Sequence, residues 1–433
     1  METDKTVSVA IIGLGYAGLP LAIQFARSEV NVIGLDVDVS RVRRLSEGRS
    51  YLADIDSSCV ADLLTKGWFT ASTDFSHVRR VTAVIICVPT PLNKNREPDI
   101  THVIDAGTSI AKYLSAGQLV VLESTVYPGA TEQDLRQVLE QGSGLTAGKD
   151  FYLAFSPERG DPGNPESHVS LIPKVIGGFT PACLERAMAL YGKAIKTVVP
   201  VSSCRTAEAT KLLENIFRSV NIALVNELKG VYEAMGIDIW EVIQAAKTKP
   251  FGYMPFYPGP GPGGHCTPIA PYYLAWKARE YGQRTRFIEM AVEINAQMPY
   301  RVVDRVVRVL NTRKKALHGS RVLIVGIAYK SNVEDVRGSP GCMLMDTLTE
   351  SGVEVAYFDP YVPVMRRSQH PDSKEAKSVN WDRQTVSSFD LVLIATAHTH
   401  VNYAELGEWA QCIVDTRNAM ARVSTGRNKT WKA

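Results

Sequence analysis

Cys266 lies in a segment whose composition favours an accessible thiol, Lys249 to Trp276 (KPFGYMPFYPGPGPGGHCTPIAPYYLAW). Two glycines at 263 and 264 precede it, so backbone amides can approach a bound group and no side chain shields the sulfur. Helical spacing after Pro271 puts the cysteine shortly before a helix start, where the backbone dipole favours a thiolate, and His265 can add to this effect. Such a thiolate can attack a carbonyl. A small buried cysteine in a tight turn is the alternative.

Lys211 and Asn215 lie four residues apart in a region with helical apolar spacing from Thr206 to Met235. They therefore project from one face of a long helix. Beside a substrate, the lysine could act as a general base or stabilise an alkoxide, while the asparagine orients a hydroxyl or a water. Polar decoration beside the apolar stripe is the alternative.

Glu158 and Arg159 follow a predicted strand in the segment FYLAFSPERGDPGN. A carboxylate at a strand end is a candidate general base or water-positioning group. An ion pair between these two neighbours is the alternative interpretation.

The elements that would position these side chains begin with a dinucleotide-binding pattern at residues 7–38. An apolar strand runs into a GxGxxG turn and a helix, and a second strand ends at Asp36, about 20 residues downstream. The glycines let a pyrophosphate approach the helix N-terminus, and the aspartate accepts from a ribose hydroxyl and repels a 2′-phosphate, which predicts NAD rather than NADP. The residues expected at the cofactor are Gly13, Gly15, Tyr16, Ala17, Gly18, Asp36 and Arg41, with a solvated side chain as the alternative for Arg41.

Two further apolar strands end in AVIICVPTPLN and LVVLESTVYPG. Ligands bind at the carboxyl ends of strands in doubly wound sheets, which places Thr90, Glu123 and Thr125 beside the nicotinamide half of the cofactor. Turn and cap chemistry is the alternative for each threonine.

Residues 320–360 repeat the strand-helix-strand theme, with Asp359 where the first unit has Asp36. The repeat lacks a full GxGxxG and is not expected to bind a second dinucleotide. Lys330 and Arg337 instead offer cations suited to a diphosphate. Residues after Asn418 are interpreted as a polar tail.

Length and charge exclude several classes of protein. A chain of 433 residues is longer than a single hydrophobic core usually supports, so two or three domains are expected. The 48 basic and 45 acidic residues nearly balance, and no apolar run approaches the roughly 20 residues that cross a bilayer, so neither a nucleic acid nor a membrane partner is expected. The start lacks the features of a signal peptide. Seven cysteines without a CxxC pair or a disulfide framework predict reduced thiols, no metal site and a cytoplasmic protein.

Taken in order, seven motifs resemble those of the nucleotide-sugar 6-dehydrogenase family, whose members oxidise UDP-glucose and GDP-mannose. They are GLGYAGLP, CVPTPLN, ESTVYPG, SPERGDPGN, KLLEN, KPFGYMPFYPGPGPGGHC and YKSNVEDVRGSP. The resemblance spans nearly the whole chain. The cysteine loop is most similar to the branch acting on UDP-N-acetylglucosamine and related UDP-N-acetylhexosamines.

The resemblance implies an NAD-dependent, four-electron oxidation of the sugar 6-hydroxyl to a carboxylate, suited to making precursors of surface polysaccharides. By similarity, Lys211 and Asn215 assist the first oxidation, and Cys266 carries a thiohemiacetal and then a thioester. Glu158 serves the later proton transfers, and Thr125 lies beside the active water and the cofactor. The residues matching substrate positions are Glu158, Arg159, Lys211, Asn215, Tyr257, Gly263, Lys330 and Arg337.

Three positions depart from the family pattern. Ala270 stands where the family has an aspartate four residues after the cysteine, which puts hydrolysis of the thioester in question. Gly338 replaces the usual glutamate after the arginine, and Gly341 replaces a small non-glycine residue at a helix start. We interpret these two glycines as tuning, because glycine costs up to about 1 kcal/mol in a helix.

The sequence therefore predicts an α/β protein with two Rossmann-like domains joined by a central long-helix domain. The expected divisions are residues 1–200 for NAD, 201–300 for the helical segment with the cysteine loop, and 301–433 for the UDP-sugar. We expect a homodimer or higher homo-oligomer through the central helices. Oxidation of UDP-glucose is one alternative function, and a non-catalytic or hydrolysis-impaired nucleotide-sugar binder is another.

Overall fold

The computed structural model describes residues 7–433 except 53, 162–168, 265, 366–374 and 426–428, and of Cys266 it describes the backbone alone. The chain forms two compact units, Met1–Glu214 with Tyr272–Arg284, and Asn215–Pro271 with Thr285–Ala433. Their boundary falls inside helix α7 (Cys204–Ala234), which is the long helix predicted from the apolar spacing.

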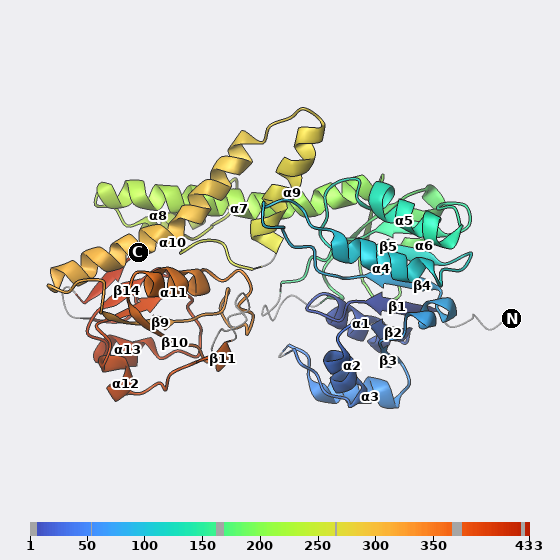
Figure 1. Ribbon diagram of the computed structural model, residues 1–433. Helices are drawn as coiled ribbons and strands as arrows, with labels where there is room; N and C mark the ends of the chain where they lie inside the picture. Colours follow the sequence, from blue (N-terminus) through green and yellow to red (C-terminus); the bar gives the residue numbers. More distant parts are fainter. Residues whose placement is uncertain (1–6, 53, 162–168, 265, 366–374, 426–428) are drawn as a thin grey trace. The chain divides into compact units, whose positions relative to one another are not determined.

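An eight-stranded sheet forms the centre of the first unit (Figure 1). In spatial order its strands are β3 (Phe69–Ser72), β2 (Asn31–Leu35), β1 (Ser8–Ile12), β4 (Ala83–Ile86), β5 (Leu119–Leu122), β6 (Tyr152–Phe155), β7 (Lys174–Gly178) and β8 (Val198–Val201). All neighbouring strands are parallel except β6 and β7. The order 3-2-1-4-5-6 is that of a doubly wound dinucleotide fold, with its reversal between β1 and β4.

Helices cover this sheet because its strands are apolar on both faces. Every residue of β4 and β5 is buried, as expected for parallel strands packed on two sides. On one face Leu19 and Phe25 pack with Tyr191 and alternate residues of β1. The helices of this unit are α1 (Gly18–Arg27), α2 (Val39–Ser46), α3 (Ser57–Thr65), the 3₁₀ helix η1 (Phe75–Arg80), α4 (Thr101–Ala111), the π-helix η2 (Thr131–Leu135), α5 (Arg136–Ser143) and α6 (Pro181–Tyr191).

A five-stranded parallel sheet forms the centre of the second unit. Its spatial order is β10 (Glu354–Phe358), β9 (Arg321–Val325), β13 (Leu391–Ile394), β14 (Ile413–Asp415) and β15 (Thr430–Lys432), and a hairpin of β11 (Val364–Met365) and β12 (Ala376–Lys377) lies apart from it. The helices are α8 (Ile239–Lys247), α9 (Cys266–Glu280, shared with the first unit), α10 (Arg286–Thr312), α11 (Pro340–Glu350), α12 (Arg383–Ser387) and α13 (Tyr403–Trp409). Residues of α10 and α11 form a core on one face of the sheet, and those of α12 and α13 form a core on the other.

Two local expectations were wrong. The segment after Asn418 is not simply a polar tail, because β15 pairs in parallel with β14 and the Ala433 amide donates to the Asp415 carbonyl over 2.9 Å. Helix α9 also begins at Cys266 rather than after Pro271. Pro268 falls within the first turn, where amides lack an intrahelical acceptor, so of the two prolines only Pro271 removes a helical bond.

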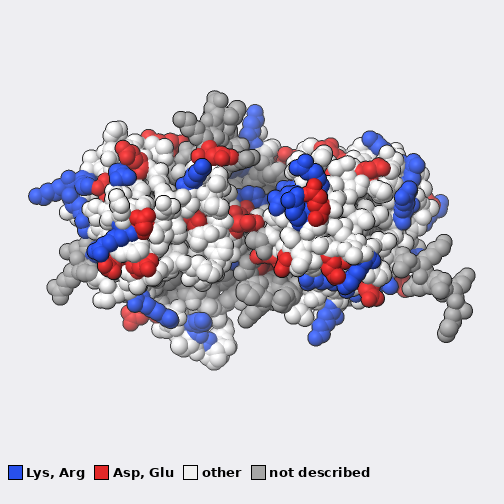
Figure 2. Space-filling model, turned by 90° about the horizontal axis from the view of Figure 1, so that it is seen from below, with Lys and Arg blue, Asp and Glu red and all other residues white. Residues whose placement is uncertain are grey.

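The predicted fold class is confirmed: two Rossmann-like α/β domains are joined through long helices. On the face drawn in Figure 2, Lys and Arg side chains are intermixed with Asp and Glu side chains over the described residues. Within the described ranges no helix is long and apolar enough to cross a bilayer. Those same residues contain no cluster of His, Cys, Asp and Glu able to hold a metal ion.

Candidate active site

The turn between β1 and α1 has the shape of a pyrophosphate cradle. A Cβ on Gly13 would lie 2.7 Å from the Cys87 carbonyl oxygen, and one on Gly18 would lie 1.9 Å from the Gly13 oxygen, so the protein's own packing requires both glycines. A Cβ on Gly15 would meet no described atom within 4 Å. Ala17 at the N-cap offers no side-chain bond to the first turn of α1. The space at Gly15 and the uncapped amides therefore fit a bound phosphate group.

Asp36, directly after β2, accepts a hydrogen bond from the backbone of this turn. One carboxylate oxygen accepts from the Leu14 amide over 2.8 Å and the other accepts from the Asp38 amide over 2.9 Å. Arg41 lies 3.6 Å from Asp36 and over the ring of Tyr51, so it is not simply a solvated arginine. These contacts leave Asp36 acceptor capacity for a ribose, as the NAD prediction requires.

Thr90 and Thr125 are joined at the carboxyl ends of β4 and β5. The Thr90 hydroxyl donates to the Thr125 carbonyl over 2.7 Å, and the Tyr273 hydroxyl donates to the Thr90 carbonyl over 3.1 Å. The two predicted residues therefore lie side by side in the first unit.

Glu123, in contrast, is occupied inside the protein. Lys174 donates to it over 2.7 Å and the Tyr191 hydroxyl donates to its other oxygen, and the Lys174 and Glu123 side chains are 5% and 1% exposed. Glu123 follows β5 as expected, but both of its carboxylate oxygens bind groups of the protein. This pair was not predicted, because Lys174 and Glu123 lie 51 residues apart in the sequence.

Lys174 also reaches Glu158, at 3.6 Å. Burial opposes the charge of Lys174, but Glu123 and Glu158 outweigh burial and raise the pKa of Lys174 above its usual range. Burial likewise acts to raise the pKa of Glu158, yet Lys174, the Gly160 amide and Lys211 together hold that pKa below its usual range. Glu158 is thus kept ionised, as a general base or water-positioning carboxylate should be.

The Lys211 ammonium donates a hydrogen bond to the Glu158 carbonyl oxygen, so two of the predicted catalytic residues lie together. Arg159 forms an ion pair with Glu214 at 2.7 Å, and the alternative pairing of Glu158 with Arg159 does not describe this segment. Asn215, one turn after Lys211 on α7, is 7% exposed.

Glu208 connects α7 to the segment that follows Thr125. Its carboxylate accepts from the Gly129 amide at 2.5 Å and from the Thr131 amide and hydroxyl at 2.9 and 2.7 Å. Burial raises the pKa of Glu208 to about 7, although these donors oppose the shift. Glu208, one turn before Lys211, was missed in the sequence because its partners lie nearly 80 residues away.

In the second unit the cysteine loop packs on the segment that carries the predicted cations. A Cβ on Gly263 would lie 2.8 Å from the Tyr329 carbonyl, and the Gly259 amide donates to Asn226 over 3.0 Å. Tyr257 stacks on Trp240 with ring centroids 5.6 Å apart. The Pro-Gly loop therefore packs within the second unit, against the residue that precedes Lys330. His265 lies outside the described residues, as does the Cys266 side chain.

The carboxylate of Asp335 orients the Arg337 side chain, a contact that was not predicted from the sequence. Asp335 binds the guanidinium through three hydrogen bonds of 2.7 to 3.0 Å, while 48% of the Arg337 side chain remains exposed. An arginine oriented in this way and half exposed is suited to binding a diphosphate.

Of the two unusual glycines, Gly338 is required by its packing, and Gly341 is closely packed. Gly338 lies before α11 with φ +59°, and a Cβ there would lie 2.8 Å from the Gly264 carbonyl. A Cβ on Gly341 would lie 3.0 Å from the Gly326 oxygen, so these two repeat the packing of Gly18 on Gly13. Ala270 is fully buried.

Three segments of the chain match domains of the UDP-glucose/GDP-mannose dehydrogenase family. The NAD binding domain matches residues 7–195, the central domain matches 205–297 and the UDP binding domain matches 323–422. A UDP-N-acetyl-D-glucosamine 6-dehydrogenase from Pseudomonas aeruginosa is 36% identical over 420 residues, which cover 95% of this chain and 97% of the relative. The chain belongs to the UDP-glucose/GDP-mannose dehydrogenase family.

Other members of the UDP-glucose/GDP-mannose dehydrogenase family act on different sugars. A UDP-N-acetyl-D-mannosamine dehydrogenase from Pyrococcus horikoshii is 33% identical over 96% of this chain and 97% of its own length. The solved structure of a UDP-D-ManNAc dehydrogenase from that organism superposes with a TM-score of 0.88 at 30% identity, over 98% of this chain and 99% of the other. A UDP-glucose dehydrogenase from Pyrobaculum islandicum gives a TM-score of 0.85 at 25% identity, covering 100% and 99%. Membership therefore establishes an NAD-dependent UDP-sugar 6-dehydrogenase and leaves the sugar open.

Proposed function

We propose that this enzyme oxidises the C6 hydroxyl of a UDP-N-acetylhexosamine, with UDP-N-acetylglucosamine as the favoured substrate, to the uronate. The observation that carries the proposal is the packing of Gly263 and Gly264, just before Cys266, on Tyr329 and Gly338 of the UDP binding domain. The nucleotide-binding segment and the backbone that leads to Cys266 thereby pack together within one unit. The 36% identity to a UDP-N-acetyl-D-glucosamine 6-dehydrogenase supports this choice of sugar.

The Gly15 cradle, the α1 N-terminus and Asp36 would hold NAD, which accepts the electrons of each oxidation. Lys211 would take up or stabilise charge at the sugar hydroxyl, with Asn215 orienting it. Cys266 would then add to the C6 aldehyde to give a thiohemiacetal, and the second oxidation would leave a thioester.

Hydrolysis of the thioester by water would complete the reaction. Glu158, kept ionised by Lys174, would accept a proton from the water that attacks the thioester, with Thr125 holding that water. Cys266 leaves as the thiolate and the uronate is released. Arg159 and Tyr257 would contact the substrate, while Lys330 and Arg337 would bind the diphosphate.

The test is to mix the protein with NAD and UDP-N-acetylglucosamine, measure NADH formed per sugar consumed, and follow the intact mass of the protein. We expect two NADH per sugar with repeated turnover, because an alcohol becomes a carboxylate with loss of four electrons. A single burst that leaves a sugar adduct on Cys266 would mean that Ala270 blocks hydrolysis. Turnover with UDP-glucose but not with the N-acetylated sugars would contradict the assignment of the substrate. If no UDP-sugar yields NADH, the remaining function is that of a non-catalytic nucleotide-sugar binder.

We further propose that the protein forms a homodimer through α7. Phe217, Leu224 and Val231 are spaced by seven residues, so they share one face of the helix, and they are 47%, 51% and 48% exposed. A second copy of this stripe would bury them.

Leu224→Glu should therefore lower the molar mass measured by light scattering from two chains towards one, because the dimer would have to bury the new charge. Arg218→Glu is the control, because this exposed position of the same helix is not three or four residues from any member of the stripe. An unchanged mass in Leu224→Glu would exclude this face as the interface.

A further inference from the structure

The two units bind their nucleotide-fold aspartates to the first turn in the same way. The Leu14 amide donates to Asp36 over 2.8 Å, and the Ile327 amide donates to Asp359 over 2.8 Å. Gly13 and Gly326, which precede these amides, have φ of +88° and +82°. Asp359 is therefore the structural counterpart of the residue that would hold the NAD ribose.

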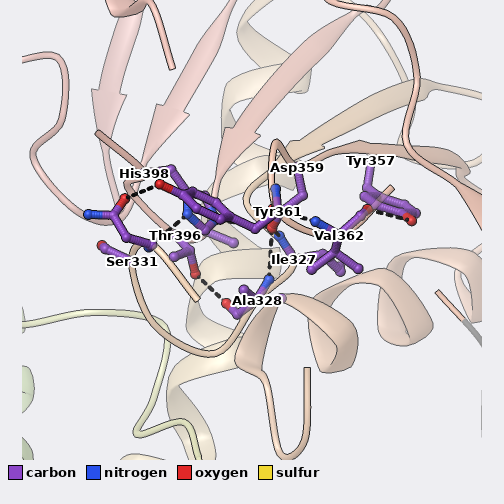
Figure 3. A network of polar contacts seen from close by, with 12 residues as sticks. Ile327, Ala328, Ser331, Tyr357, Asp359, Tyr361, Val362, Thr396 and His398 are labelled. Carbon is purple, nitrogen blue, oxygen red and sulfur yellow. Dashed lines mark hydrogen bonds and ion pairs between the residues drawn. The ribbon is translucent and has the colours of Figure 1, made fainter. Parts of the chain in front are cut away.

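Asp359, however, is already occupied by the protein. His398 Nε2 lies 3.0 Å from the Asp359 Oδ2 atom, and both side chains are fully buried (Figure 3). The remaining partners are four backbone amides at 2.8 to 3.2 Å, those of Ile327, Ala328, Tyr361 and Val362. The imidazole thus occupies an acceptor atom of Asp359, so we expect no ribose hydroxyl to bind this aspartate.

The other nitrogen of the same imidazole holds a loop. The Asn332 amide donates to His398 Nδ1 over 3.0 Å, so Nδ1 is an acceptor and the ring hydrogen lies on Nε2, directed at Asp359. Ser331 adds a bond of 2.6 Å from its hydroxyl to the Ala397 carbonyl.

Asn332 itself is held on both sides. Its backbone has φ +63°, and its side-chain oxygen accepts from the Thr399 amide and hydroxyl at 3.0 and 3.1 Å. The segment that begins at Lys330 is therefore held to the turn after β13 by bonds to Ala397 and Thr399, and by one backbone bond that ends on the buried imidazole of His398.

We propose that His398 is a positioning residue that holds the Lys330 loop in the conformation which binds the nucleoside diphosphate of the substrate. The chain of contacts runs from Asp359 through the imidazole to the Asn332 amide, two residues from Lys330. This inference rests on the proposed function, because Lys330 has a ligand only if the UDP-sugar binds there. Without the imidazole the loop must be ordered when ligand binds, and ordering one or two residues is equivalent to about 10- to 100-fold in Kd.

Three substitutions separate the two roles of the ring. In His398→Asn the amide oxygen can lie where Nδ1 lay and accept from Asn332. In His398→Gln the side chain can reach Asp359 but offers Asn332 no acceptor. His398→Phe loses both bonds. The probe is UDP, measured by titration calorimetry on the full chain, with NAD affinity and thermal unfolding measured in parallel.

We expect UDP to bind about 10- to 100-fold more weakly to the Gln and Phe variants than to the wild type, with the Asn variant rescued to within a few-fold. KM for the UDP-sugar should rise by a similar factor, while NAD affinity stays unchanged because the Gly15 cradle belongs to the other unit. If His398 had only a structural role, UDP affinity would fall in step with the unfolding temperature of each variant. The Asn and Gln variants would then bind UDP equally well.

Two outcomes overturn the inference in different ways. If the wild type binds UDP and the Gln and Phe variants bind it within two-fold, His398 does not position the loop, and the proposed function stands. If the wild type does not bind UDP at all, the proposed function falls, and the inference falls with it.

Discussion

Cys266→Ala should abolish complete oxidation while leaving nucleotide binding intact. Without the thiol no thiohemiacetal or thioester forms, so kcat for uronate formation should fall on the order of 10³-fold or more. The Kd for UDP should change by less than about two-fold, because the diphosphate is expected at Lys330 and Arg337. The measurement is NADH per sugar together with UDP titration calorimetry.

Cys59→Ala is the matched control. Cys59 is a half-buried free thiol in α3, within 3.1 Å of an Arg27 nitrogen, and no step of the proposed reaction uses it. Its removal should leave two NADH per sugar. Full turnover by Cys266→Ala would remove the covalent mechanism and require water to attack the aldehyde directly.

Lys174→Met should both destabilise the first unit and shift the pH dependence of turnover. Glu123, 1% exposed, would lose its cation, and breaking a buried pair costs about 3–5 kcal/mol of unfolding free energy. Glu158 would also lose the charge 3.6 Å away that helps to depress its pKa.

The sign of the pH effect follows from that depressed pKa. Glu158 contributes stability above its unfolded pKa of about 4.3, and this contribution is lost as the pH falls through the lower folded pKa. In Lys174→Met the pKa of Glu158 rises, so the acid limb of the kcat profile should move to higher pH. The measurements are thermal unfolding and kcat against pH.

A double variant separates the two effects. Glu123→Gln with Lys174→Met removes both members of the buried pair and should recover much of the stability, since replacing a whole pair is far less costly than breaking one. The acid limb should stay shifted, because Glu158 still lacks its cation. Lys193→Met, at an exposed lysine of the same unit, should change neither property. An unshifted acid limb in both Lys174 variants would show that Lys174 does not tune Glu158.

Several elements could be predicted because their signals are local in the chain. The glycines at 13–18, with Asp36 at the end of the next strand, specify a dinucleotide fold, since a tight turn, an open helix N-terminus and an acceptor for a ribose each require a particular residue at a particular spacing. The apolar spacing after Thr206 likewise specified a long helix, because helical burial repeats every three to four residues.

The buried polar pairs and the edge strand could not be predicted, because their partners come together only in the folded chain. Lys174 meets Glu123 across 51 residues and His398 meets Asp359 across 39, and neither pair has a spacing that a local pattern can detect. The last strand, Thr430–Lys432, has one large apolar residue and forms because β14 offers it an unpaired edge. Gly338 is required by the Gly264 carbonyl 74 positions earlier rather than by its own helix. In each case the partner is supplied by the fold, so the physical reason for the residue becomes visible only once the strands are in register.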